Sequence, residues 1–388
     1  MILHFVTWFP SKKNPIDGIF IRRHIELLAK DNTSNHIVVR KSENEISILS
    51  HFLSLLGFFK TETQQGLQVL ELPQQSFLYR RFFWRFKDRL EKYQLRRLIK
   101  KYKPSINHLH VVYGFGNEAV YIKKRLEVPF IVSEHMGPFP FQWIADKERL
   151  IINPMKEADA VVAVSNAQAK EIKTFTGIQS QVIPNIIDSA EFHFLNFPQQ
   201  NTNKGLQIVL VGIYNSGNGA DYLIEAMPGF IKKNTGCTLH LVGAATDERM
   251  GFLMEQIESL RIKESVIFHG ILDAKELCEL YNQCDFYVCA SEWESFGVSV
   301  LEALYSGLPV LSTRCGGVLE FVNEGNGLLI ENDRKVETLV NGLLQISEQP
   351  KSFNRSAISE EVIEKFSGQK IKEQYYKIYN EVSGGAKI

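Results

Sequence analysis

The sequence predicts two doubly wound α/β domains, each built on a parallel β-sheet. Short apolar runs alternate with amphipathic helical stretches along all 388 residues, a length sufficient for two ordinary cores. The alternation is interrupted by the polar stretch 189–205, so we expect a first domain at 1–188 and a second at 189–367. In order, the expected strands are Ile37–Val39, Ile106–Val112, Phe130–Val132, Ala160–Val164, Ile208–Val211, Thr238–Val242 and Val266–Phe268.

Composition excludes several classes of protein. Lys plus Arg and Asp plus Glu both number 44, which argues against a nucleic-acid binder. The five cysteines form no C-x-x-C pair, which favours a reducing compartment and argues against a cysteine metal site. Met1–Val6 carries no basic leader, and the apolar run Phe52–Phe59 is too short to cross a bilayer. We therefore expect a cytoplasmic protein, with peripheral attachment to the inner face of the cell membrane as the alternative.

A strand, a polar loop and a helix are expected in the second domain. The apolar run Asp285–Cys289 predicts a buried parallel strand, and Val298–Tyr305 predicts a helix that Gly307 ends. The start of that helix, at Phe296 and Gly297, offers unpaired backbone N–H groups and the positive end of the helix dipole. This is a favourable position for a phosphate.

Two glutamates flank this phosphate position. Glu294 lies in the expected loop and Glu302 inside the expected helix, with seven residues between them. Carboxylates beside a phosphate would repel it unless they accept hydrogen bonds from hydroxyl groups. A sugar on one side of a diphosphate and a ribose on the other would satisfy both carboxylates, so the pattern predicts a nucleotide-sugar ligand.

The spacing Glu294-x7-Glu302, with Phe296-Gly297 inside it, resembles the signature of glycosyltransferase family 4, retaining enzymes with the GT-B fold. Further segments are similar to landmarks of that family and follow in its order: Phe5–Pro10 with Gly18–Arg22, Ile131–His135, Ala158–Ser165, Val182–Asn185, and Gly316-Gly317 with Glu320. The resemblance implies two Rossmann-like domains facing a cleft. It also implies a C-terminal helix, at about 368–388, that crosses back to the first domain.

The same resemblance assigns roles at the donor site. It implies that Glu294 binds hydroxyls of the donor sugar and that Glu302 accepts the ribose hydroxyls. The amides of Phe296, Gly297 and Val298 would meet the sugar and the diphosphate. Glu320 would brace the loop beneath the nucleotide.

Two further candidates lie in the first domain. His135 follows the strand Phe130–Val132, where the family has a histidine near the reacting sugar. The alternative is a histidine hydrogen-bonded at the base of a loop. Gly18 follows the first strand, where its backbone would approach the donor diphosphate or the acceptor, although Asp17-Gly18 is also an ordinary turn pair.

The second domain departs from the family pattern at the phosphate. After Ile208–Val211 the family commonly has an arginine and then a lysine, but this chain has Ile213 and Asn218. Another cation can substitute, the candidates being Arg314, Lys12, Lys13 and Arg22. Alternatively, Ser216, Asn218 and the amides of Gly217 and Gly219 form a neutral phosphate nest, or the enzyme is weak or inactive.

No D-x-D pair stands at the end of a strand, so we expect no metal at the diphosphate and no cofactor beyond the nucleotide-sugar substrate.

A basic, aromatic stretch runs from 76 to 101 in the first domain. At helical spacing Tyr79, Phe82, Phe83, Phe86, Leu90 and Tyr93 form an apolar face, and arginines and lysines, among them Arg80, Arg81 and Arg85, occupy much of the rest. Such a helix can lie on an anionic membrane, with Phe52–Phe59 as a second apolar contact. The alternative is an apolar face packed on the sheet and a solvated basic face.

Together these observations predict a retaining glycosyltransferase of the hexosyltransferase type. It would transfer a sugar from a nucleotide diphosphate to a hydroxyl of a glycan or a lipid-linked acceptor in envelope polysaccharide or glycolipid biosynthesis. Ile213 and Asn218 motivate one alternative, a catalytically impaired sugar-nucleotide-binding protein. A second alternative is a GT-B nucleotide-sugar epimerase, which would need no acceptor.

Overall fold

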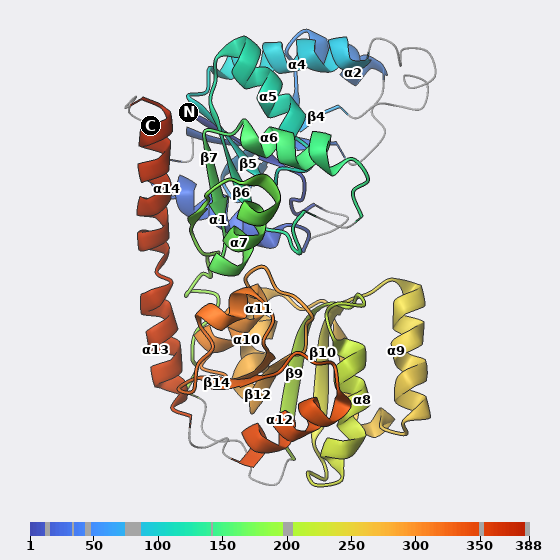
Figure 1. The fold of residues 1–388 in the computed structure, drawn as a ribbon. Coiled ribbons are helices and arrows are strands. Elements are labelled where there is room, and N and C mark those ends of the chain that lie inside the picture. The colour runs from blue at the N-terminus through green and yellow to red at the C-terminus, as the bar shows by residue number, and fades with distance from the viewer. Residues whose placement is uncertain are drawn as a thin grey trace. The chain divides into compact units, whose positions relative to one another are not determined.

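The computed structural model describes residues 1–11, 16–32, 35–42, 48–73, 87–140, 143–196, 205–348 and 353–384. The chain divides into two compact α/β units (Figure 1). Unit 1 comprises Met1–Ile186 and Gly368–Ile388, and unit 2 comprises Ile187–Ser367. Among the described residues, no helix is long and apolar enough to cross a membrane.

Unit 1 is built on a sheet of order β3-β4-β2-β1-β5-β6-β7-β8, parallel except where β3 runs antiparallel to β4. Its strands are β1 (Ile2–Val6), β2 (His36–Lys41), β3 (Lys60–Gln64), β4 (Leu67–Leu72), β5 (Ile106–His110), β6 (Phe130–Glu134), β7 (Ala160–Ala163) and β8 (Gln181–Val182). The expected strand Ile106–Val112 ends early, at His110, because Val111 leaves the extended region with φ 72°.

Helices cover both faces of this sheet (Figure 1). They are α1 (Ile19–Ala29), α2 (Ile48–Leu55), α4 (Lys87–Tyr102), α5 (Gly116–Leu126), α6 (Asn153–Lys156), α7 (Asn166–Thr176) and α14 (Gly368–Val382), with a π-helical turn at Glu148–Ile152. Helix α14 carries Ile371, Tyr375, Ile378 and Tyr379 at helical spacing and buries them in a cluster with strand residues such as Ile2. The C-terminal helix is therefore part of the unit 1 core.

The expected apolar face of the basic stretch is only partly described. Residues 76–86 lie outside the described residues, and α4 begins at Lys87. Along α4 the buried face runs through Leu95, Leu98 and Ile99, whereas Tyr93 is 47% exposed. Tyr93 was expected on the apolar face. Its exposure argues against the alternative of an apolar face packed on the sheet, because the buried stripe lies on another side of the helix.

Unit 2 is built on a fully parallel sheet of order β11-β10-β9-β12-β13-β14. The strands are β9 (Gln207–Ile213), β10 (Thr238–Ala244), β11 (Val266–Gly270), β12 (Phe286–Cys289), β13 (Val310–Thr313) and β14 (Gly327–Ile330). The helices are α8 (Ala220–Ile231), α9 (Asp247–Ser259), α10 (Ala274–Gln283), α11 (Val298–Tyr305), α12 (Val336–Glu348) and α13 (Arg355–Lys365), with 3-10 turns at Lys263–Ser265 and Gly317–Glu320.

The strand order of unit 2 reverses between β9 and β12. In open α/β sheets, ligands bind beyond the carboxyl ends of the strands at such a reversal. The loops that follow these two strands are 214–219 and 290–297. The second of these loops contains Glu294, so the fold places the glutamate predicted from sequence at the expected binding edge.

Candidate functional site

The loop between β12 and α11 requires a glycine at its end. Gly297 caps α11 with φ 91°, and a Cβ there would lie 2.6 Å from Cγ1 of Val318. The backbone therefore turns sharply into the helix, and the first N–H groups of α11 have no partner within the helix. The expected strand, loop and helix are all present.

Glu294 is fixed at both its backbone and its side chain. Its N–H donates to the carbonyl of Cys315 (3.1 Å), and its own carbonyl accepts from the N–H of Gly317 (2.8 Å). The hydroxyl of Ser291 donates to Oε1 of Glu294 at 2.8 Å. Burial raises the pKa of Glu294, and the hydrogen bond from Ser291 opposes that shift. A carboxylate held in this way is preorganised to accept hydrogen bonds from ligand hydroxyls.

The other residues of this motif divide into core and site positions. The side chain of Phe296 is buried, with its ring 5.3 Å from that of Phe321 and 5.9 Å from that of Phe366. Its ring therefore belongs to the core, which leaves the backbone as the part of Phe296 suited to a ligand. Val298 is the first residue of α11, and Glu302 is buried one turn further on.

Arg314 and Glu320 lie on the neighbouring segment. Arg314 follows β13, and its Nε lies 3.3 Å from Oε1 of Glu331 with half of its side chain exposed. Glu320 ends the 3-10 turn after β13, and its carbonyl accepts from Nζ of Lys365.

The loop after β9 contains the two positions at which the family commonly has an arginine and a lysine. Ile213 ends the strand and is 62% exposed. Asn215 accepts with its Oδ1 from the N–H groups of Gly217 and Asn218, both at 2.9 Å. These two amides therefore already have an internal partner. Oδ1 of Asn218 is buried with no hydrogen-bond partner among the described residues.

The same loop is tied to the loop of Glu294. The carbonyl oxygen of Asn218 lies 3.2 Å from the hydroxyl of Ser291, whose one proton goes to Glu294, and the carbonyl of Gly217 accepts from the N–H of Glu292 (2.9 Å). Gly219 caps α8 with φ 83°, and a Cβ there would lie 2.0 Å from the carbonyl oxygen of Ala290. The two loops at the reversal point thus form one packed structure.

Two arginines adjoin this structure that the sequence analysis did not propose. Arg249, from the first turn of α9, lies 3.0 Å from Oδ2 of Asp221. Arg334, from the loop after β14, donates to the carbonyl of Ala290 at 3.0 Å and lies 4.4 Å above the ring of Tyr222. Of the cations that the sequence analysis did propose as substitutes, Lys12 and Lys13 lie outside the described residues.

Arg22, the remaining proposed cation, belongs to unit 1, where its Nε lies 3.3 Å from Oε1 of Glu26. Gly18 caps α1 in the same unit with φ 62°, and a Cβ there would lie 2.4 Å from the carbonyl oxygen of Trp8. A close backbone approach therefore suffices to explain this glycine.

His135 is buried and both of its ring nitrogens have partners. Nδ1 lies 2.9 Å from Oδ1 of Asn185, and Nε2 lies 3.4 Å from Nδ1 of His110. Burial lowers the pKa of His135 to about 4, and the contact with Asn185 opposes that shift. The imidazole is therefore neutral at physiological pH, and its two partners fix its orientation.

Both halves of the chain match families of sugar-transferring enzymes. Residues 193–362 match the family described as Glycosyl transferases group 1, and residues 44–191 match Glycosyltransferase Family 4. The chain belongs to glycosyltransferase family 4. The GT-B fold of this family accounts for the two parallel sheets.

Known proteins of similar sequence and structure agree with this assignment. Alpha-monoglucosyldiacylglycerol synthase of Streptococcus pneumoniae is 25% identical over 272 residues, which cover 65% of this chain and 60% of the relative. Sucrose-phosphate synthase from Thermosynechococcus elongatus superposes with a TM-score of 0.77 at 16% identity, over 100% of both chains. HepE from Anabaena, in complex with UDP and glucose, gives 0.75 at 18% identity over 97% of this chain and 98% of its own.

The matched segment spans 60% and 64% of two curated relatives, which is less than two thirds of their length. The solved structures, which superpose over nearly the full chain at 16% and 18% identity, establish the GT-B fold.

The residues that sequence analysis missed follow a recognisable rule. Arg249 and Arg334 follow strands β10 and β14, whose carboxyl ends share an edge with those of β9 and β12. A search for cations between the end of each strand and the first turn of the next helix would have found both arginines. Asn185 lay within a landmark of the family, but its pairing with His135 joins residues 50 positions apart and has no local signal.

Proposed function

We propose that this chain is a retaining glycosyltransferase that uses a nucleotide-sugar donor and a hydroxyl acceptor. One observation carries the proposal. The preorganised carboxylate of Glu294 lies at the reversal point of the unit 2 sheet, directly before a glycine-capped helix that also carries Glu302. Carboxylates for two sets of hydroxyls, with phosphate-binding amides between them, match a nucleotide-diphosphate sugar.

In this proposal each part of the donor has a separate partner. The amides of Gly297 and Val298 and the dipole of α11 bind the diphosphate, and Glu302 accepts the ribose hydroxyls. Glu294 orients the donor sugar, and the donor's own phosphate assists deprotonation of the acceptor. Arg334 and Arg249 supply positive charge in place of the cations that Ile213 and Asn218 lack. No metal or cofactor is required.

A thermal-shift screen against UDP-, GDP-, ADP- and dTDP-sugars without added metal tests the donor site. We expect a selective stabilisation that Glu302→Ala removes and that Glu255→Ala, an exposed substitution on α9, leaves intact. If no donor stabilises the protein, or if Glu302→Ala binds as well as the parent, the proposed site is wrong.

The transfer reaction is tested with the donor that this screen identifies. Incubation with glycan and lipid-linked acceptors should give a product in which the anomeric configuration of the donor is kept, as read by NMR. An inverted product would contradict the retaining mechanism. Conversion of the donor without any acceptor would favour an epimerase.

A second candidate function is a sugar-nucleotide-binding protein without turnover. Ile213 and the partnered amides of the 214–219 loop favour it, because a leaving phosphate would lose charge-assisted contacts there. Donor binding at normal affinity, with no transfer to any acceptor in a broad panel, would support this candidate over the first.

A lipid-linked acceptor would place the protein at the cytoplasmic face of a membrane, and unit 1 carries a surface suited to it. Phe52, Leu56 and Phe58 are 58%, 46% and 64% exposed, although they are large apolar side chains. Nearby, Arg97 donates to the carbonyl of Leu56 at 2.7 Å, and Lys101 donates to the carbonyl of Gly57 at 3.3 Å. Apolar side chains beside cations fit the interface of an anionic bilayer.

Binding to vesicles of anionic lipid tests this surface. Phe52→Ser with Phe58→Ser should weaken vesicle binding, whereas Phe252→Ser, which changes a phenylalanine of unit 2 that is 49% exposed, should not. Equal binding by all variants, or no binding by the parent, would exclude this surface as a membrane contact.

A further inference from the structure

Six buried histidines gather on one face of the unit 1 sheet. They are His4 (β1), His24 (α1), His36 (β2), His108 and His110 (β5), and His135 after β6. Register explains part of this, because β1 pairs with β5 so that His4 lies opposite His108 and Val6 opposite His110. All six side chains are buried, which favours the neutral imidazole.

Four of these side chains form a continuous chain of ring-to-ring contacts. Nε2 of His135 lies 3.4 Å from Nδ1 of His110, and Nε2 of His110 lies 3.1 Å from Nδ1 of His4. Nε2 of His4 lies 2.9 Å from Nδ1 of His36. The chain crosses the sheet from the carboxyl end of β6 to the amino end of β2.

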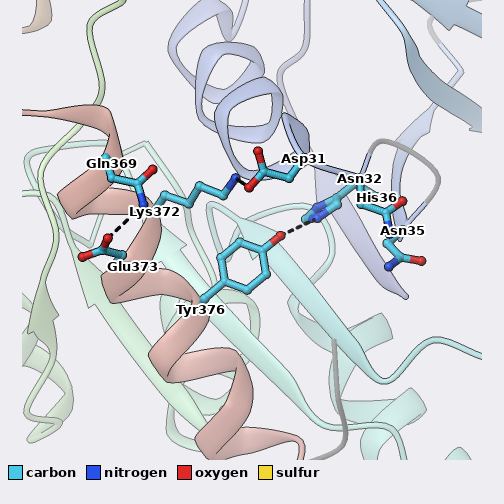
Figure 2. A pocket seen from close by; sticks show the side chains of 8 residues that line it. All are labelled: Asp31, Asn32, Asn35, His36, Gln369, Lys372, Glu373 and Tyr376. Atoms are coloured by element: carbon cyan, nitrogen blue, oxygen red, sulfur yellow. Dashed lines mark hydrogen bonds and ion pairs between the residues drawn. The ribbon is translucent and has the colours of Figure 1, made fainter.

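The partners at the two ends of this row of four histidines determine which ring nitrogens carry a proton. At one end, Nδ1 of His135 faces Oδ1 of Asn185 at 2.9 Å, and an oxygen acceptor requires a proton on that nitrogen. At the other end, the hydroxyl of Tyr376 donates to the carbonyl of Leu28 at 2.9 Å. That hydroxyl therefore accepts from Nε2 of His36, 3.2 Å away (Figure 2).

One proton is then missing from the middle of the chain. A neutral imidazole carries a single N–H. Because His135 donates to Asn185, His110 must donate to His135, and because His36 donates to Tyr376, His4 must donate to His36. Nδ1 of His4 and Nε2 of His110 are left as two lone pairs that face each other across 3.1 Å. Two buried acceptors in contact are unfavourable unless a cation lies between them.

We propose that His4, His108 and His110 bind one transition-metal ion, with zinc as the first candidate. The ligating nitrogens of these three side chains lie within 4.8 Å of one another. Imidazole binds zinc at about 2.0–2.1 Å, which separates the nitrogens of a tetrahedral site by roughly 3.3 Å, so the rings must move closer together when the ion binds. Imidazole is also the nitrogen ligand that zinc, copper and nickel prefer.

A proton is the other cation that the gap could take. Metal binding needs the unprotonated imidazole, so the metal content of the purified protein distinguishes the two.

Each proposed ligand has a partner for its other nitrogen. Metal-binding histidines are normally oriented by such partners. His4 pairs with His36, and His110 pairs with His135. Nδ1 of His108 lies 2.7 Å from the hydroxyl of Tyr379 and Nε2 lies 2.7 Å from that of Ser133, so ligation by His108 displaces one hydroxyl and keeps the other as its partner. Through the first two pairs, the hydrogen bonds point away from the ion and end on the oxygens of Asn185 and Tyr376. This polarisation offsets the lack of a carboxylate among the ligands.

His24 packs beside this group, and its surroundings also lack a polar partner. Both of its ring nitrogens are buried without a hydrogen-bond partner among the described residues. Its ring centroid lies 6.0 Å from that of His110 and 4.6 Å from that of Tyr375. A buried polar group without a partner is destabilising, so this part of the core lacks a donor or a cation.

The metal content of the untagged full-length protein, purified without chelators, tests the site. We expect about one zinc ion per chain by elemental analysis. After the metal is stripped, Co²⁺ should restore thermal stability and give the visible absorption bands of a tetrahedral nitrogen site. These readouts do not depend on catalysis, so they succeed or fail separately from the proposed transferase activity.

Two variants locate the ion. His108→Gln and His4→Gln should each lose the metal, whereas His240→Gln should keep it, because His240 pairs with His269 in unit 2. If these two variants fail to fold, the Co²⁺ spectrum of the parent protein decides. The proposal is overturned if the parent contains no metal and shows neither a Co²⁺ spectrum nor a thermal shift with Zn²⁺, or if folded His108→Gln and His4→Gln both retain the metal.

Discussion

The binding edges of the two sheets are built in opposite ways. In unit 2, Ser291, Glu294 and Gly297 come from one loop of a few residues, and the neighbouring loop after β9 is hydrogen-bonded to it. In unit 1, the contacts of His135 reach Asn185 and His110, which lie 50 and 25 positions away along the chain.

Desolvation shifts the pKa of the candidate residue in both regions, but in opposite directions. Burial raises the pKa of Glu294 in unit 2 and lowers the pKa of His135 in unit 1. In each case desolvation favours the neutral form. Unit 2 opposes this with a hydroxyl donor and an adjacent helix N-terminus, which suits a site that interacts with charge. Unit 1 connects neutral rings to one another, which suits a site that holds its residues in a fixed arrangement.

The largest effect that would sharpen this comparison is expected from Glu294→Gln. The amide keeps the size of the side chain but replaces one acceptor oxygen by a donor, so the sugar hydroxyls lose a partner. We expect transfer to fall by about a thousandfold or more, as for other preorganised polar groups at a reacting centre. Circular dichroism should show an unchanged fold.

Glu292→Gln is the matched control, since Glu292 lies in the same loop with 58% of its side chain exposed. It should retain most of the activity. Undiminished turnover in Glu294→Gln would remove this carboxylate from the site and leave the two edges without a functional difference.

The sequence predicted unit 2 better than unit 1 for this same reason. The strand, loop and helix around Glu294 are local, and their glycine and apolar patterns are visible in consecutive residues. The hairpin of β3 and β4 was missed because β3, with the sequence KTETQ, is polar along its whole length and shows no apolar alternation. Its turn residues Gln65 and Gly66 adopt positive φ (46° and 84°). Helical periodicity placed Tyr93 on an apolar face but could not decide what that face contacts, and the structure leaves Tyr93 exposed.

The histidine cluster could not have been predicted from a single sequence. Its members are scattered from His4 to His135, and its outer contact reaches Tyr376 on α14. Each histidine taken alone fits a satisfied core position. Only the register of β1 with β5 and the docking of α14 bring the rings together. Long-range pairing of this kind leaves no periodic trace in sequence.

Two glycines with similar backbone conformations allow the cost of a steric clash to be distinguished from the cost of backbone strain. Gly219 in unit 2 and Gly177 in unit 1 both have positive φ, 83° and 76°. A Cβ at Gly219 would lie 2.0 Å from the carbonyl of Ala290, whereas a Cβ at Gly177 would meet nothing within 4 Å. Gly177→Ala should destabilise by about 1–2 kcal/mol through the left-handed backbone alone.

Gly219→Ala should destabilise the protein more, by roughly 3 kcal/mol or beyond, because a backbone oxygen must move as well. Chemical denaturation of both variants measures the difference. Equal losses would show that the loop after β9 is not held tightly against the end of β12, which would weaken the description of the unit 2 edge as a packed structure.

Arg334→Gln tests whether unit 2 compensates for its missing cations. Arg334 donates to the carbonyl of Ala290 and lies near Asp221 and Glu292, at 4.0 and 3.8 Å. If it supplies charge to the diphosphate, donor affinity should fall about tenfold, the scale of one charge-assisted hydrogen bond. Isothermal titration with the preferred donor measures this.

Arg261→Gln is a suitable control because Arg261 is an exposed arginine that follows α9 on the same unit. An equal loss of affinity in both variants would indicate a general effect of net charge. No loss in Arg334→Gln would leave Arg249 and the amides of α11 as the partners of the diphosphate.

The smallest expected effect is the pH dependence of stability in Glu294→Gln. A raised pKa means that the folded parent binds a proton more tightly than the unfolded chain does. Its stability therefore falls as pH rises from the ordinary glutamate value, near 4.5, through the raised value, and the full penalty remains above that. Glutamine has no such penalty, so the variant should melt at a higher temperature than the parent at pH 8, and this advantage should vanish at pH 4. A variant less stable than the parent at pH 8 would mean that the charged carboxylate has stabilising partners. The edge of unit 2 would then be built for structure, as the edge of unit 1 is, and the contrast between them would disappear.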